Sequence, residues 1–151
     1  MTACRPPAIN QAWFRAPRWN VRRERVIRCA VRVLICDDNV DSANTWAALL
    51  DAEGYDVRIS HFGDGCVQEA LVWQPQAALV DIGLPGINGY AVARAIRASA
   101  GGAAILLIAV TGYDTPQDLA ASEAAGFDHH FRKPADVDAV LRLLQTGRSR
   151  R

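Results

Sequence analysis

Four short apolar runs of this chain each end in side chains that can take part in chemistry. In chain order these side chains are Asp37 and Asp38, Asp81, Thr111, and Lys133. A Gly- and Pro-rich stretch follows Asp81, so the strand before it must give way to an exposed turn. Considered alone, Asp81 is best explained as a cap on that turn. The acids, hydroxyl and lysine at the other strand ends favour a functional site instead.

These groups can meet in space although they are far apart in the chain, because the carboxyl ends of parallel strands share one edge of a doubly wound sheet. Three carboxylates in one crevice repel one another unless a cation is present, and a hard divalent ion with oxygen ligands, Mg²⁺ above all, meets that need. A lysine and a hydroxyl nearby suit the oxygens of an incoming phosphoryl group. An Asp carboxylate can itself accept that group as an acyl phosphate.

The apolar spacing predicts strand and helix units that alternate five times. The expected strands cover 31–36, 55–60, 76–81, 104–110 and 128–131, and the expected helices cover 40–50, 64–73, 89–100, 116–125 and 137–144. The fourth strand is the most apolar and needs cover on both faces, which is typical of a parallel sheet. The chain therefore predicts an α/β fold, a doubly wound (βα)5 sandwich around a parallel five-stranded sheet.

The helical spacing also predicts which side chains face the core. In the first expected helix, Val40 and Leu50 belong to the apolar stripe, and in the third, Arg94 and Arg97 face outward. Thr115 is the expected N-cap of the fourth helix. Such one-sided helices are expected to cover the two faces of the sheet.

Length and composition indicate one globular domain with a sizeable core, since half of the 151 residues are apolar and 22% are charged. The longest apolar run, 103–110, is too short to cross a bilayer. The four cysteines (Cys4, Cys29, Cys36 and Cys66) form no CxxC pattern. Disulfides and structural zinc are therefore not expected, and a cytoplasmic location fits best.

Charge divides the chain into three parts. Residues 1–30 carry seven Arg and one Glu, residues 31–147 carry a net charge of −8, and residues 148–151 contain three Arg. We expect a basic, disordered N-terminal extension, a folded acidic body and a basic tail; a basic arm for an acidic partner is the alternative for the extension. The acidic body argues against nucleic-acid binding by the domain itself.

Four motifs resemble those of the receiver domain of two-component response regulators. They are CDDN (36–39), VDIGLPGING (80–89), AVTG (109–112) and FRKP (131–134). Each motif is weak alone, but all four, in order, at the ends of strands one, three, four and five, are specific. The resemblance spans residues 31 to about 145. It implies a flavodoxin-like sheet in the order 2-1-3-4-5 and a signalling switch rather than an enzyme.

The resemblance also implies a role for each matching residue. Asp81 would accept the phosphoryl group from a phosphohistidine of a histidine kinase or a histidine phosphotransfer protein. Mg²⁺ would be bound by Asp37, Asp38, Asp81 and the carbonyl of Gly83. Gly83 and Tyr113 would also tune the rate of dephosphorylation.

Three further residues would respond to the phosphoryl group. Thr111 and Lys133 would each bind one of its oxygens. Phe131, two residues before the lysine, matches the aromatic residue that swings inward on activation and fills the space that Thr111 vacates. Lys133-Pro134 matches the cis peptide bond of the family. The surface around the fourth helix, fifth strand and fifth helix would then change its protein contacts.

Three other functions compete with that of a phosphorylated receiver. A Mg²⁺-dependent hydrolase lacks a second acid at DxD spacing after Asp81, and an FMN protein would need a phosphate-cradling loop where the acidic 37–39 segment lies. A receiver-like interaction module would lack an acid, the threonine or the lysine, and all are present. His129 and His130 are interpreted as ordinary strand residues, because phosphotransfer histidines lie on exposed helices.

The motifs are compatible with two kinds of parent protein. A stand-alone regulator, monomeric or weakly dimeric, is the first interpretation, and the terminal receiver of a hybrid sensor histidine kinase is the alternative. The expected partners are a phosphohistidine donor and an unknown downstream protein target, with no membrane association.

Overall fold

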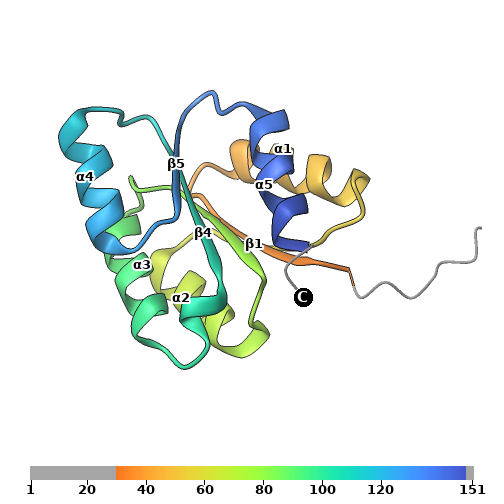
Figure 1. Cartoon of the computed structure of the whole chain (residues 1–151), viewed down its shortest axis with the longest axis horizontal. Coiled ribbons are helices and arrows are strands. Elements are labelled where there is room, and N and C mark those ends of the chain that lie inside the picture. Colours follow the sequence, from red (N-terminus) through yellow and green to blue (C-terminus); the bar gives the residue numbers. More distant parts are fainter. Residues whose placement is uncertain (1–29, 149–151) are drawn as a thin grey trace, which may run out of the picture.

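The computed structural model describes residues 30–148. The expected N-terminal extension, apart from its last residue, and the tail from 149 onward lie outside the described residues. Five strands and five α-helices alternate along the described part (Figure 1). They are β1 (Arg32–Cys36), α1 (Val40–Ala52), β2 (Asp56–Ser60), α2 (Gly63–Trp73), β3 (Ala77–Val80), α3 (Gly89–Ala98), a 3₁₀ turn η1 (Gly102–Ala104), β4 (Leu106–Thr111), α4 (Pro116–Ala125), β5 (His129–Arg132) and α5 (Val137–Arg148).

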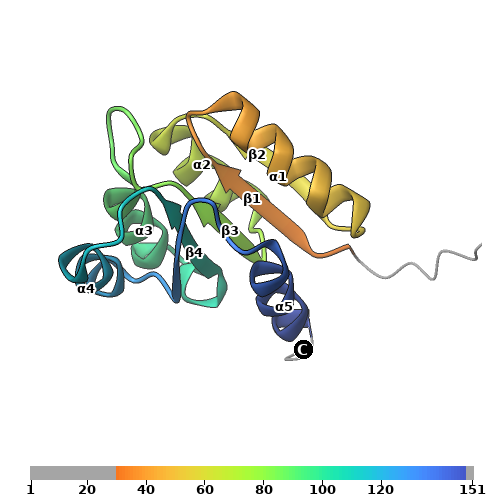
Figure 2. The same cartoon turned by 90° about the horizontal axis from the view of Figure 1, so that it is seen from above.

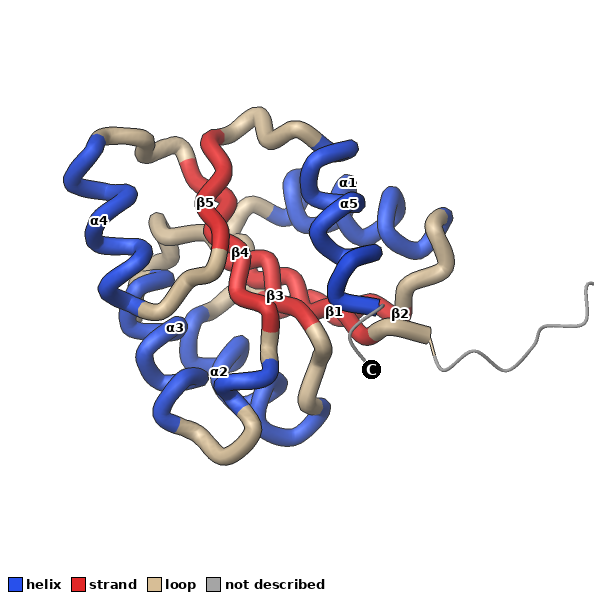
Figure 3. Tube along the Cα trace, viewed as in Figure 1, coloured by secondary structure: helices blue, strands red, loops and turns tan. Residues whose placement is uncertain are grey.

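The strands form one parallel sheet in the order β2-β1-β3-β4-β5. Helices α1 and α5 cover one face, and α2, α3 and α4 cover the other, which Figure 2 shows from above and Figure 3 shows by element type. The predicted α/β sandwich and its strand order 2-1-3-4-5 are confirmed. Because all the strands are parallel, the carboxyl end of every strand lies at the same edge of the sheet.

The core has two layers, one on each face of the sheet. Successive residues of a strand point to opposite faces, so Leu34 packs under α2 and α3 while Val33 and Ile35 pack under α1 and α5. The central strands are buried on both faces, as the apolar run of β4 predicted. Each fully buried Leu, Ile or Val contributes about 1.5–3 kcal/mol relative to an exposed side chain.

The predicted helix faces hold for most residues, but two side chains differ from prediction. Val40, the first residue of α1, is 52% exposed, whereas Leu50 is buried as predicted. Arg94 is exposed as predicted, but Arg97 is half-buried. Its guanidinium donates to three backbone carbonyls and pairs with Asp128. A long arginine at the rim of a helix can reach such groups, which apolar spacing does not reveal.

Element boundaries differ slightly from the predicted ones. β4 begins at Leu106 because η1 occupies Gly102–Ala104, and α5 continues through Gly147 to Arg148. Glycine weakens a helix without forbidding it, so the predicted domain boundary at 147 falls within the last helical turn. Within residues 30–148, no helix combines the length and apolar character needed to span a bilayer.

Candidate functional site

Three carboxylates converge at the carboxyl edge of the sheet. β1 and β3 are neighbours, with Cys36 opposite Val80, so the acids that follow these two strands must lie close together. Oxygens of Asp37, Asp38 and Asp81 lie within 4.8 Å of one another. Asp37 is buried, Asp81 is half-buried and Asp38 is exposed. A cluster with one open side can receive a ligand from solvent.

Asp37 is held by the start of α1. Its Oδ1 accepts from the backbone N–H of Asn39 at 3.0 Å, and its Oδ2 accepts from the hydroxyl of Ser42 at 2.7 Å. Asn39 in turn caps the helix by accepting from the N–H of Ser42 at 2.9 Å. The sequence predicted Asp37 but not the contact with Ser42, which depends on the helix turning back over the acid.

Lys133 connects two of the acids. Its ammonium donates to Asp81 Oδ2 at 2.7 Å and to Asp37 Oδ2 at 2.9 Å. Burial of Lys133 lowers its pKa, but the hydrogen bonds and charges of Asp81 and Asp37 outweigh burial and raise the pKa above 10.5. The lysine is therefore protonated at neutral pH. Three carboxylates and one ammonium leave a formal charge of −2, which a divalent cation would neutralise.

The loop after β3 fixes the other oxygen of Asp81. The N–H of Gly83 donates to Asp81 Oδ1 at 3.0 Å, and Gly86 makes the turn with a φ of +79°. Gly89, the first residue of α3, packs directly against the backbone of Asp81 and Ile82. A Cβ at Gly89 would overlap that backbone, so the close approach requires glycine. Both Asp81 oxygens are thus oriented by the chain.

Thr111 and Tyr113 border the site from β4. Thr111 is fully buried at the end of the strand, and its Oγ1 accepts from the N–H of Tyr113 at 3.3 Å. Tyr113 is 57% exposed. A Cβ built on Gly83 would lie 3.7 Å from both Tyr113 Cε2 and Asp81 Oδ1, so the ring stands at the edge of the acidic cluster.

The geometry does not fit the expected role of Phe131. Phe131 is opposite Val110 in the sheet and packs with the layer under α1 and α5. Thr111, one residue after Val110, points to the other face, so Phe131 cannot fill space there without crossing the sheet. His130 is the β5 residue on the α4 side, where it contacts Ser122. Which of two adjacent residues faces α4 depends on strand register, which the sequence pattern left open.

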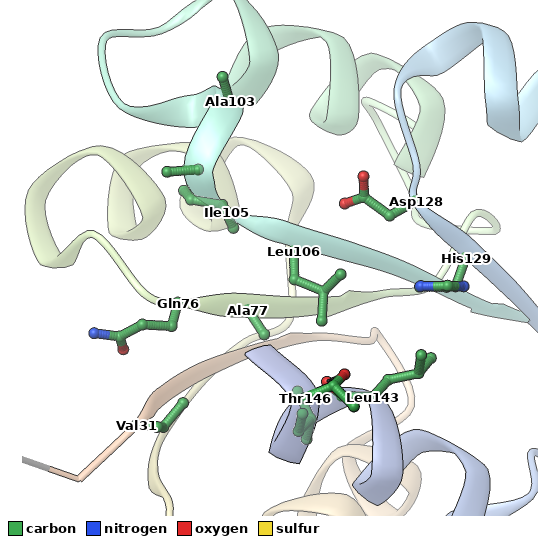
Figure 4. Close-up of a pocket in the computed structure, with 12 residues that line it drawn as sticks. Val31, Gln76, Ala77, Ala103, Ile105, Leu106, Asp128, His129, Leu143 and Thr146 are labelled. Carbon is green, nitrogen blue, oxygen red and sulfur yellow. Dashed lines mark hydrogen bonds between the residues drawn. The ribbon is translucent and has the colours of Figure 1, made fainter. Parts of the chain in front are cut away.

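A separate groove of about 650 Å³ opens at the opposite edge of the sheet (Figure 4). Val31, Gln76 and Asp128, which immediately precede β1, β3 and β5, line it together with Leu143 of α5. The acidic cluster follows the other ends of β1 and β3. The groove is therefore distinct from the candidate site.

A model of the response regulator receiver domain matches residues 33–145. The chain belongs to this family. Its Lys133-Pro134 peptide bond is cis, the isomer that the FRKP motif implied. As a receiver, it is a signalling module of two-component systems and not a classical enzyme.

Relatives of this receiver come from different kinds of protein. It is 30% identical over 113 residues to Protein PilH of Pseudomonas aeruginosa, an alignment covering 75% of this chain and 93% of PilH. It is 32% identical over 111 residues to the CAI-1 autoinducer sensor kinase/phosphatase CqsS of Vibrio cholerae, covering 73% of this chain but 16% of CqsS. The chain thus spans nearly all of one relative and a small part of another.

Solved structures show the same fold. The receiver domain of sensor histidine kinase PA1611 from Pseudomonas aeruginosa, with a magnesium ion coordinated in its active site cleft, is 29% identical with a TM-score of 0.72. The alignment covers 78% of this chain and 96% of that one. A CheY-like receiver from Methanospirillum hungatei is 26% identical with a TM-score of 0.70, covering 80% and 98%.

Proposed function

We propose that this receiver, residues 31–147, takes a phosphoryl group onto Asp81 from a phosphohistidine of a histidine kinase or histidine phosphotransfer protein, in the cytoplasm. The observation that carries the proposal is the bridge from Lys133 to Asp81 and Asp37 inside a three-carboxylate cluster. A structural ion pair needs one acid for one lysine. Three acids around one lysine leave charge that a cation and a phosphoryl group can use.

Asp81 is suited to act as the nucleophile. Its Oδ1 receives the Gly83 N–H and its Oδ2 receives the ammonium of Lys133, so the carboxylate has a fixed orientation. A carboxylate oxygen attacks phosphorus, and the bond between phosphorus and the imidazole nitrogen breaks. The nitrogen keeps the electron pair and takes a proton from solvent. The products are an acyl phosphate on Asp81 and a neutral histidine on the donor.

The residues present fit Mg²⁺. Asp37, Asp38, Asp81 and the Gly83 carbonyl would hold it, because carboxylate and carbonyl oxygens are its preferred protein ligands. When bound, the ion would offset the negative charge shared by the acids and the incoming phosphoryl oxygens. The PA1611 receiver, whose structure contains magnesium, supports this assignment by similarity.

Lys133 and Thr111 would then move toward the phosphoryl group on Asp81. Phosphorylation adds about −1.5 to −2 charge, which attracts the ammonium of Lys133 and the hydroxyl of Thr111 to phosphoryl oxygens. Movement at the end of β4 would change the surface around α4, β5 and α5 and so its contacts with a downstream protein. A complete switch, from about 1:99 to 99:1, requires roughly 5.5 kcal/mol of differential stabilisation.

The test is labelling with acetyl phosphate and Mg²⁺, measured by intact mass. The wild type should gain one phosphoryl group, and Asp81→Asn and the wild type in EDTA should gain none. Asp56→Asn is the matched control, because Asp56 is an exposed acid at the start of β2. Absence of an adduct, under conditions that label another receiver, would refute the proposal. An adduct that persists in Asp81→Asn would refute the assignment of the acceptor.

A further inference from the structure

His130 joins the loop after β4 to helix α4. Its Nε2 lies 2.9 Å from the carbonyl oxygen of Tyr113, and its Nδ1 lies 2.8 Å from the hydroxyl of Ser122. A carbonyl only accepts, so Nε2 must carry a proton, and in the neutral ring Nδ1 accepts from the Ser122 hydroxyl. Ser122 is 1% exposed. The loop is thus attached through one imidazole to a buried point on α4.

Tyr113 is held at both of its backbone polar groups. Its N–H donates to Thr111 Oγ1 at 3.3 Å, and its carbonyl accepts from His130 at 2.9 Å. The adjoining loop residues Gly112 and Asp114 are exposed, and so is Tyr113. These two bonds therefore hold an exposed ring beside Gly83 at the edge of the acidic cluster.

A movement of Thr111 would weaken one of the two hydrogen bonds of Tyr113 and leave the other in place. In the proposed function, Thr111 turns its hydroxyl toward a phosphoryl oxygen, which draws Oγ1 away from the N–H of Tyr113. The bond from His130 to the Tyr113 carbonyl lies outside that movement, because His130 is anchored to Ser122 on α4. The position of Tyr113 in the phosphorylated protein then depends chiefly on His130.

We infer that His130 is a positioning residue that holds the ring of Tyr113 over the acyl phosphate and slows its hydrolysis. The inference rests on the proposed function, which supplies the acyl phosphate. Water must reach phosphorus to hydrolyse the acyl phosphate, and a ring fixed beside Gly83, at the edge of the acidic cluster, occupies part of that approach. His130 acts through Tyr113 and does not touch the reacting atoms.

Two substitutions separate the two bonds of His130. In His130→Gln, the side-chain amide can place its N–H near the position of Nε2 and keep the bond to Tyr113. In His130→Asn, the shorter amide reaches the position of Nδ1, so it keeps the contact with Ser122 and loses Tyr113. A purely structural role in joining α4 to β5 predicts that Asn is the milder change. Positioning of Tyr113 predicts that Gln is the milder change.

The experiment measures loss of the phosphoryl group by intact mass after acetyl phosphate is removed. His130→Asn should shorten the lifetime roughly two- to tenfold, the range that one neutral hydrogen bond provides, and His130→Gln should stay near wild type. Tyr113→Ala should also shorten it, and adding His130→Asn to Tyr113→Ala should change it no further. An unchanged lifetime in His130→Asn, or additive effects in the double variant, would overturn the inference.

Hydrogen exchange separates failure of this inference from failure of the proposed function. If wild type takes no phosphoryl group, the proposed function fails, but the loop can still be followed in the unphosphorylated protein. Peptides spanning 112–115 should exchange faster in His130→Asn than in His130→Gln or wild type. Equal exchange in all three proteins would show that His130 does not hold Tyr113.

Discussion

Lys133 sets the charge balance of the acidic site. It stabilises two carboxylates that would otherwise face each other, and it does so from the end of a different strand. Within residues 30–148, the neighbouring Arg132 forms an exposed ion pair with Asp114 at 3.9 Å. Two basic residues adjacent in sequence thus have different energetic roles, because one enters the crevice and the other stays on the surface.

Replacing Lys133 by Met should destabilise the protein in EDTA by about 1–3 kcal/mol, since Asp37 and Asp81 lose a shared donor whose partial exposure moderates the effect. Mg²⁺ should then raise the melting temperature of Lys133→Met more than that of wild type. Thermal unfolding with and without Mg²⁺ measures both quantities. Arg132→Met is the control and should cost at most about 1 kcal/mol. Equal Mg²⁺ shifts in wild type and Lys133→Met would contradict the charge-balance argument.

At the scale of the element, the N-terminus of α4 is closed by reciprocal hydrogen bonds. The Thr115 hydroxyl accepts from the N–H of Asp118 at 3.2 Å, and the Asp118 carboxylate accepts from the Thr115 N–H at 3.0 Å and from its hydroxyl. These bonds from Thr115 lower the pKa of Asp118 below 3.8. The sequence predicted the Thr115 cap but not the return bond, which completes a capping box.

The capping box gives a pH-dependent term in stability. Because the folded-state pKa of Asp118 is lowered, its contribution is fully present above pH 3.8 and is lost as the pH falls through the folded-state value. Asp118→Asn should therefore lower the urea midpoint at neutral pH, and the difference from wild type should shrink as the pH falls below 3.8. Glu123→Gln, at the other end of α4, should be neutral or slightly stabilising because an acid opposes the helix dipole there. A difference independent of pH would exclude this role for the Asp118 charge.

At the scale of the molecule, Arg97 ties together the edge of the sheet that lies away from the acidic site. Its guanidinium donates to the carbonyls of Gly102, Ile105 and Gly126, each at 2.7–2.8 Å, and pairs with Asp128 at 2.7 Å. Asp128 also accepts from the N–H of Leu107 at 2.8 Å. One side chain thereby joins α3, η1, the end of α4 and the start of β5.

Arg97→Ala should lower the free energy of unfolding by about 2–4 kcal/mol, because three part-buried hydrogen bonds to backbone carbonyls lose their charged donor at once. Urea denaturation measures the loss. Arg94→Ala, on the exposed face of the same helix, is the matched control and should change stability by less than about 0.5 kcal/mol. Phosphoryl labelling of folded Arg97→Ala should persist, since Asp81 lies at the opposite edge. A cost no larger than that of Arg94→Ala would show that these bonds contribute little.

The sequence by itself determined the alternation of strands and helices, the parallel sheet and the convergence of Asp37, Asp38, Asp81 and Lys133. Local apolar spacing defines each strand, and the carboxyl ends of parallel strands all lie at one edge of the sheet. The topology alone therefore predicts that these four residues are neighbours. Gly and Pro likewise defined the turn after Asp81 locally.

Only the tertiary structure decided which side chains share a face and which polar groups meet. Phe131 and His130 are adjacent, and the register of β5 against β4 places one under α5 and the other against α4. The contacts of Arg97 with Gly126 and of Lys133 with Asp37 span many residues of chain. Such pairings depend on how elements dock, which local periodicity does not encode.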